Sequence, residues 1–113
     1  MPSLSLRINL DPEGRIGPGK IELLEQIAAS GSISAGARQM NMSYKRAWDL
    51  VEEMNRMFGK PVLDTQKGGQ GGGGAQLTPT GQALVGRFRA IEQAATEAAA
   101  PHIAALQAEI GEE

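Results

Sequence analysis

The 113-residue sequence predicts one mainly α-helical domain with a small β component, on the strength of three observations. Apolar residues recur with helical spacing in four segments, two of which are short and nearly adjacent. Short apolar runs on both sides of a glycine-rich segment are typical of a β-hairpin. The absence of cysteine and the single histidine exclude a disulfide scaffold, a zinc finger, thiol catalysis and a metal site that needs several imidazoles.

The first two predicted elements are a strand and a helix. Apolar and polar residues alternate from Leu4 to Leu10, which is the period of a half-buried strand, and the tetrapeptide DPEG then predicts a turn. From Pro18 the apolar period becomes helical, and Gly31 is expected to end this helix of about three turns. The predicted inward face comprises Ile21, Leu24, Ile27 and Ala28.

Two more helices are expected directly afterwards. Ser32 suits the cap of a short helix, and Asn41 suits a left-handed stop. Ser43 is expected to cap the next helix, which runs to Phe58 and is closed by Gly59. Two short helices joined by a tight turn form a helix-turn-helix unit.

The second helix of this unit begins with Tyr44, Lys45 and Arg46. Basic residues at a helix N-terminus oppose the helix macrodipole, so local stability does not explain Lys45 and Arg46. Recognition helices present their N-terminal residues to the DNA major groove, and the pattern therefore predicts contacts with phosphates or base edges. The alternative for any single basic residue is an ordinary solvated surface charge.

The glycine-rich segment from Gly68 to Gly74 holds six glycines in seven positions. Short apolar runs around Leu63 and Leu77 flank it, which predicts a β-hairpin wing over about residues 62–78, with Lys67 placed to meet phosphates. A linker is disfavoured because neither half of the chain could bury a core of its own. A phosphate-binding loop would need Gly-Lys-Ser/Thr opening a helix. A loop without any role is the alternative for the glycines themselves.

The C-terminal segment predicts a long helix. Thr78 suits its cap and Pro79 its first position. The seam of apolar residues on this helix predicts a homodimer interface, and Pro101 is expected to kink or break the helix. The seam comprises Leu84, Phe88, Ile91, Ala95 and Ala98. The predicted organisation is therefore a winged helix-turn-helix over residues 1–78 and a dimerisation helix over residues 79–113.

The segment from Gly31 to Val85 resembles the N-terminal DNA-binding domain of the molybdate-dependent transcriptional regulators (ModE type), which are winged-helix relatives of the LysR-type regulators. The motifs SYKRAW, EMN and the glycine-rich wing carry the resemblance. It implies that Ser43 to Arg46 face DNA, that Lys67 to Ala75 form the wing, and that the helix from Pro79 forms the dimer interface. The family's C-terminal molybdate-binding portion has no counterpart before Glu113, so molybdate binding is not expected, whereas a role with molybdenum-related genes is.

The predicted function is a non-enzymatic, cytoplasmic, dimeric regulator that binds double-stranded DNA without a cofactor. Formal net charge is −2, but the segment from Ser32 to Arg89 carries eight basic and four acidic residues, so a favourable field for DNA lies in the middle of the chain. No apolar run is long enough for a membrane span. The alternative is a winged-helix module that binds another protein and no DNA. The predicted DNA-binding residues are Ser32, Ser34, Ser43, Tyr44, Lys45, Arg46, Lys67 and Gln70.

Overall fold

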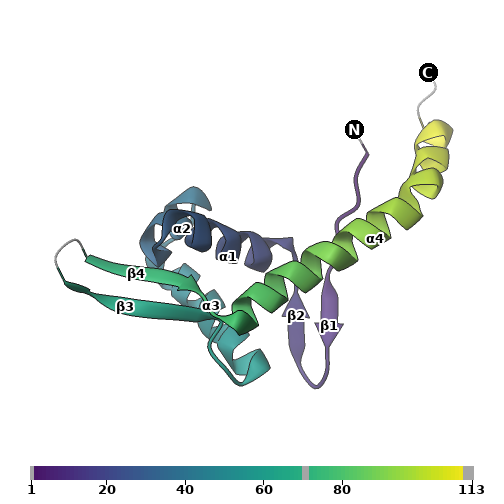
Figure 1. The fold of residues 1–113 in the computed structure, drawn as a ribbon. Coiled ribbons are helices and arrows are strands. Elements are labelled where there is room, and N and C mark those ends of the chain that lie inside the picture. Colours follow the sequence, from purple (N-terminus) through teal and green to yellow (C-terminus); the bar gives the residue numbers. More distant parts are fainter. Residues whose placement is uncertain (1, 70–71, 111–113) are drawn as a thin grey trace.

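The computed structural model describes residues 2–69 and 72–110 (Figure 1). Three helices form a compact body, from which one hairpin projects on one side and a long helix extends on the other. The elements in chain order are β1 (Ile8–Leu10), β2 (Gly14–Ile16), α1 (Pro18–Ser30), α2 (Ile33–Gln39), α3 (Tyr44–Phe58), β3 (Leu63–Gly69), β4 (Gly72–Leu77) and α4 (Pro79–Ile110). The predicted mainly helical, winged helix-turn-helix architecture with a long C-terminal helix is confirmed.

The boundaries of the three body helices follow from the caps that the sequence predicts. Gly31 ends α1 with a φ of 85°, and Asn41 takes the left-handed conformation between α2 and α3 with a φ of 56°. The hydroxyl oxygens of Ser32 and Ser43 accept hydrogen bonds from the third residues of α2 and α3, both at 3.0 Å. In the turn between α2 and α3, the backbone N–H groups of Asn41 and Met42 donate hydrogen bonds to the carbonyls of Arg38 and Ala37, at 3.1 and 3.0 Å.

The main core lies between α1, α2 and α3. Its buried residues are Leu23, Leu24, Ile27, Ile33, Ala37, Ala47, Leu50, Val51, Met54, Val62, Leu63 and Ala75. The predicted inward face of α1 includes Ala28, but that residue is exposed, and Leu23 is buried instead. The helix therefore turns a slightly different face inward from the one that its spacing predicts.

The described residues of the glycine-rich segment belong to an antiparallel hairpin of β3 and β4, in which Leu63 pairs with Leu77. The base of the hairpin is part of the core, since Leu63 and Ala75 are buried. The backbone N–H of Ala75 donates a 2.8 Å hydrogen bond to the carbonyl of Gly31, which fastens the hairpin to the end of α1. The predicted wing is confirmed for the described part of this segment.

The N-terminal segment differs from its prediction. The strand expected from Leu4 to Leu10 is limited to Ile8–Leu10, and it pairs antiparallel with β2, a second strand that the sequence pattern did not predict. A strand of three residues is too short to show an alternating pattern. The hairpin matters for packing because Ile16, at its end, is buried against Ile21 and Phe88.

Helix α4 begins where predicted, with Thr78 Oγ1 accepting a hydrogen bond from the N–H of Gly81 at 3.1 Å. The sequence pattern assigned Phe88 to a dimer interface, but Phe88 is 1% exposed in the core of its own chain. Pro101 lies inside α4, which continues to Ile110 without a break and changes direction near its C-terminal end (Figure 1). No helix within residues 2–69 and 72–110 combines the length and apolar character that crossing a membrane requires.

An ion pair joins α4 to α1. The guanidinium of Arg89 donates hydrogen bonds to both carboxylate oxygens of Glu25, at 3.0 and 2.7 Å, and to Glu92 at 2.6 Å. The hydrogen bond from Arg89 lowers the pKa of Glu25, against the opposing effect of partial burial. The bidentate geometry orients α4 across the body.

Glu25→Gln is expected to lower the free energy of unfolding by less than about 1 kcal/mol at pH 7, because both side chains are about a third exposed to screening solvent. Since the pKa of Glu25 is lower in the folded state, its stabilisation is present above the ordinary value of 4.5 and is lost as the pH falls through the folded pKa. Urea titrations at pH 7 and pH 3 measure the difference between the variant and the wild type, which should shrink at pH 3. Glu22→Gln on the exposed side of α1 is the control. A difference that stays constant with pH would contradict the assignment.

Candidate nucleic-acid interface

The first turn of α3 forms an exposed polar surface. Ser43, at its N-cap, and Tyr44, Lys45 and Arg46 are all exposed, and Tyr44 retains 55% of its accessible surface. The ring of Tyr44 meets Trp48 edge to face at a centroid distance of 6.4 Å. Trp48 is half-buried against the core, so it supports Tyr44 from the inner side.

The two cations of this turn differ in their environment. The Lys45 ammonium lies 3.1 Å from Asp49 Oδ2, one helical turn away, in a pair whose side chains are 83% and 55% exposed. A pair this exposed contributes little to stability and is easily exchanged for another anion. Arg46 is exposed, and no ion pair involves it within the described residues. No acidic residue occupies the first turn of α3, so both cations add to the positive end of the helix macrodipole.

The serines of the preceding helix have local partners. The Ser32 oxygen caps α2, and the Ser34 hydroxyl accepts a hydrogen bond from Arg38 at 3.2 Å. Ser34 and Arg38 are both exposed, which places a cation beside one of the predicted phosphate contacts. Arg38 was absent from the predicted site, although its spacing of four from Ser34 on one helix face was a usable signal.

The predicted wing residues are only partly described. Lys67 lies in β3, but its side chain is outside what the structure describes. Gln70 lies outside the described residues altogether. The other DNA-binding candidates gather at the start of α2 and the start of α3, the two helices of the helix-turn-helix.

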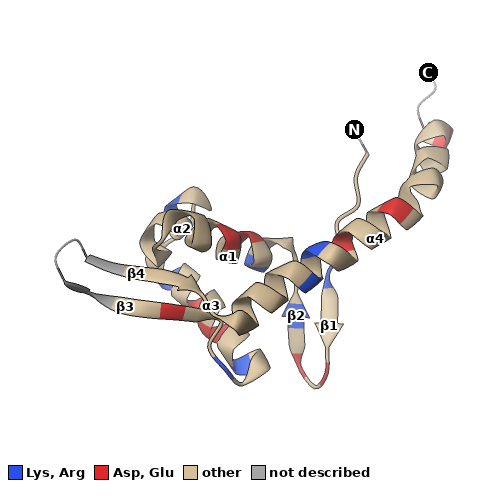
Figure 2. Cartoon of the chain, in the orientation of Figure 1, with Lys and Arg blue, Asp and Glu red and all other residues tan. Residues whose placement is uncertain are grey.

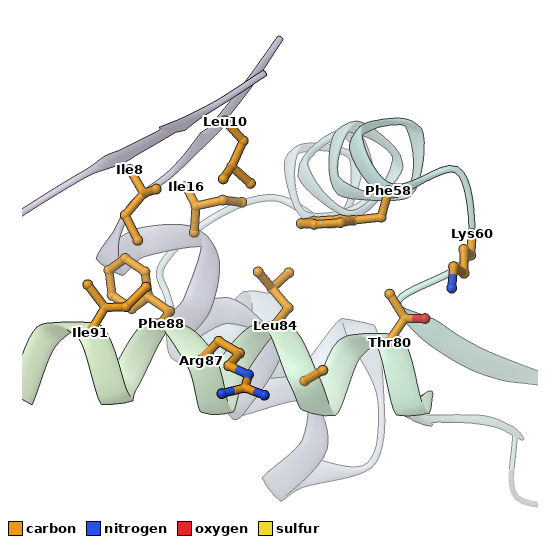
Figure 3. Close-up of a pocket in the computed structure, with 11 residues that line it drawn as sticks. Ile8, Leu10, Ile16, Phe58, Lys60, Thr80, Leu84, Arg87, Phe88 and Ile91 are labelled. Carbon is orange, nitrogen blue, oxygen red and sulfur yellow. The ribbon is translucent and has the colours of Figure 1, made fainter. Parts of the chain in front are cut away.

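The predicted dimer seam divides into two parts. Leu84 and Phe88 pack within their own chain, where they contribute to an apolar groove of about 360 Å³ between α4, the end of α3 and the β1–β2 hairpin (Figure 3). Figure 3 shows the side chains of Ile8 and Leu10 facing α4 across this groove. Ile91 is 46% exposed, and the seam beyond it is exposed or half-buried.

A helix-turn-helix with a β-hairpin wing and an exposed polar first turn on its second helix defines a winged helix-turn-helix protein. Residues 19–82 match the bacterial regulatory helix-turn-helix proteins of the lysR family. The chain belongs to this family.

Curated relatives give a narrower likeness. The chain is 47% identical to the molybdenum-pterin-binding protein MopB of Rhodobacter capsulatus over 78 residues, which are 69% of this chain and 29% of the relative. It is 46% identical to the DNA-binding transcriptional dual regulator ModE of Escherichia coli over 76 residues, which are 67% of this chain and 29% of that regulator. The chain therefore spans less than a third of the length of these relatives.

A solved structure supports the fold. The crystal structure of the CbnR_DBD–DNA complex superposes with a TM-score of 0.59, covering 77% of this chain and 94% of that chain. Sequence identity is 20%, so the likeness concerns the arrangement of helices and strands alone.

Proposed function

We propose that this chain binds double-stranded DNA through the first turn of α3 and acts in transcription regulation of molybdenum-related genes. The observation that carries the proposal is the exposed set of Ser43, Tyr44, Lys45 and Arg46 at the positive end of α3. The hydroxyl groups of Ser43 and Tyr44 and the two cations can donate hydrogen bonds to phosphate oxygens and to the acceptors on the guanine edge.

The chemistry of this turn favours a nucleic acid over a neutral partner. Lys45 and Arg46 repel each other and gain nothing from the helix macrodipole, so their position costs stability in the free protein. An approaching phosphate removes this cost, and the exchangeable contact of Lys45 with Asp49 leaves the ammonium available. Ser34 and Arg38 of α2 would add contacts with the phosphate backbone of the DNA.

The names of the relatives support the biological setting. ModE is described as a DNA-binding transcriptional regulator, and MopB as a molybdenum-pterin-binding protein. The motif SYKRAW lies within residues 19–82, the part of the chain that matches the regulator family. We therefore infer a regulatory role linked to molybdenum, exercised in the cytoplasm where the DNA is found.

A homodimer is part of the same proposal. The apolar face that covers the core near Leu84 and Phe88 continues along α4 beyond the body through Ile91, Ala95 and Ala98. Leu106 extends the same face and is 66% exposed. A second copy would bury this face, and small residues allow two helices to approach closely.

Ala98→Glu is therefore expected to convert a dimer to a monomer, because it places a charge in the centre of the proposed interface. Light scattering coupled to gel filtration measures the mass. Ala100→Glu is the matched control, since it lies about 200° away around the helix and should leave the mass unchanged. Equal masses for the wild type and both variants would contradict the interface.

NMR titration of the labelled protein with duplex DNA tests where the DNA binds. The amide signals expected to shift most are those from the N-termini of α2 and α3. Shifts confined to α4, or no shifts at low salt, would contradict the proposal and favour the protein-binding module instead.

A further inference from the structure

A second group of cations lies outside the helix-turn-helix, around a hollow of about 310 Å³ where the β1–β2 hairpin meets the first turns of α1 and α3. Every charged residue that lines the hollow is a cation. Arg7 precedes β1, Arg15 lies in β2, Lys20 in the first turn of α1 and Arg46 in the first turn of α3. The fold thus gathers four positive charges from distant parts of the sequence.

Lys20 is the fixed member of this group. Its side chain is 15% exposed, and its ammonium donates a hydrogen bond to the carbonyl of Arg15 at 2.7 Å and lies 3.4 Å from a carboxylate oxygen of Glu53. Glu53 therefore balances Lys20, and Lys20 in turn ties the hairpin to α1. The other three cations, Arg7, Arg15 and Arg46, are exposed, and no ion pair involves them within the described residues.

Three guanidinium groups around one hollow repel one another, so their convergence is unfavourable unless an anion lies between them. Guanidinium groups match the geometry of phosphate oxygens through paired N–H donors. Figure 2 shows that the acidic residues of the β1–β2 hairpin gather at its tip, whereas its cations lie nearer the helices. Asp11 and Glu13 of the tip line an adjoining hollow, which Arg15 and Arg46 also line. Neither acidic residue lines the hollow that includes Arg7.

We propose that Arg7 and Arg15, together with Arg46, bind the phosphate backbone of the duplex beside the groove that α3 enters. This inference rests on the DNA binding proposed above and adds the β1–β2 hairpin as a second backbone contact. Arg46 connects the two surfaces, because it belongs both to the first turn of α3 and to the hollow. The hollow is open and its arginines are exposed, which suits a polyanion lying across the surface.

The two hairpins would then contact DNA on different sides of the recognition helix. Figure 1 shows the β3–β4 hairpin and the β1–β2 hairpin projecting from different sides of the helical body. Contacts with phosphate fix position and orientation on the duplex without reading its sequence. The β1–β2 hairpin is therefore a positioning element, and its loss should affect all duplexes alike.

The test is the double variant Arg7→Ala/Arg15→Ala, titrated with an operator duplex and a scrambled duplex over a range of salt concentrations. The slope of log affinity against log salt should become shallower by roughly 0.9 for each phosphate that the variant no longer neutralises. For two such phosphates, the affinity ratio of wild type to variant should be about tenfold larger at 50 mM than at 200 mM salt. The ratio of operator to scrambled affinity should not change.

Two control variants separate this contact from the effects of net charge and folding. Lys60→Ala/Arg87→Ala removes the same charge from exposed residues beside the apolar groove, and it should change the slope much less. Arg7→Lys/Arg15→Lys keeps the charge and should retain most of the wild-type slope. Equal slopes for the wild type and the alanine double variant would overturn the inference.

Two further outcomes are distinguishable. A wild type that binds neither duplex contradicts the proposed function itself, whereas a wild type that binds while the double variant matches it contradicts the hairpin contact alone. Titration with inorganic phosphate or molybdate tests a free anion as the ligand. Saturable binding of either anion that needs Arg7 and Arg15, without a change in the DNA salt slope, would also overturn the inference.

Discussion

Gly81→Ala is expected to lower the free energy of unfolding by about 2 kcal/mol, since overpacking costs about 3 kcal/mol and the better helix propensity of alanine recovers about 1 kcal/mol. A Cβ at position 81 would overlap the backbone carbonyl oxygen of Val62, which a small side-chain movement cannot relieve. The same region holds Thr78, whose N–H bonds to the Val62 carbonyl at 3.1 Å. The start of α4 and the base of the wing would have to separate.

Gly86→Ala provides the matched control for this prediction. Gly86 lies in the same helix and is exposed, and no atom lies within 4 Å of the place that an added methyl group would take. The substitution should raise the free energy of unfolding by about 0.5–1 kcal/mol, because alanine favours a helix over glycine. Chemical denaturation measures both variants. Shifts of the same sign for Gly81→Ala and Gly86→Ala would contradict the close packing of α4 against the wing.

Lys45→Ala is expected to weaken operator binding by about 1–3 kcal/mol, roughly a 5- to 150-fold loss, because its ammonium is proposed to contact a base edge. Arg46→Ala removes one of the proposed phosphate contacts and should weaken binding to operator and scrambled duplexes alike. The physical reason is that each substitution removes a cation from the positive end of α3 without touching the core. Neither variant should change the unfolding midpoint by more than a small amount, since both side chains are exposed.

Affinities for operator and scrambled duplexes, measured by fluorescence anisotropy, separate the two kinds of contact. Loss of a base contact reduces the ratio of the two affinities, whereas loss of a phosphate contact reduces both equally. Lys60→Ala, after the end of α3, is the control and should bind nearly as the wild type does. Unchanged operator binding by both Lys45→Ala and Arg46→Ala would contradict a role of α3 in recognition.

The features of the fold that the sequence predicts are those set by local interactions. Ser32, Ser43 and Thr78 cap helices, and Gly31 and Asn41 take left-handed conformations, all as expected. Each depends on hydrogen bonds or backbone preferences within a few residues. The wing was also predictable, because short apolar runs on both sides of its glycines are typical of the two strands of a β-hairpin.

The features that escaped prediction depend on contacts between distant segments. The spacing of Phe88 on α4 fits a dimer seam equally well, and only the packing of Ile16 and Ile21 against it shows that it belongs to its own core. Likewise, Arg7 and Arg15 lie in a segment with no motif, and their approach to Arg46 depends on a hairpin whose second strand has three residues. The spacing of apolar residues along the chain contains no information about these contacts between distant segments.

The most direct test of the central claim is an anisotropy titration of the wild-type protein with two labelled duplexes, one carrying an operator of the Escherichia coli ModE type and one scrambled, at two salt concentrations, with and without molybdate. Sequence-specific DNA binding predicts tighter binding to the operator and a steep loss of affinity as salt rises. Binding that is equal for both duplexes would contradict sequence recognition by α3. No binding to either duplex at low salt would contradict DNA binding altogether.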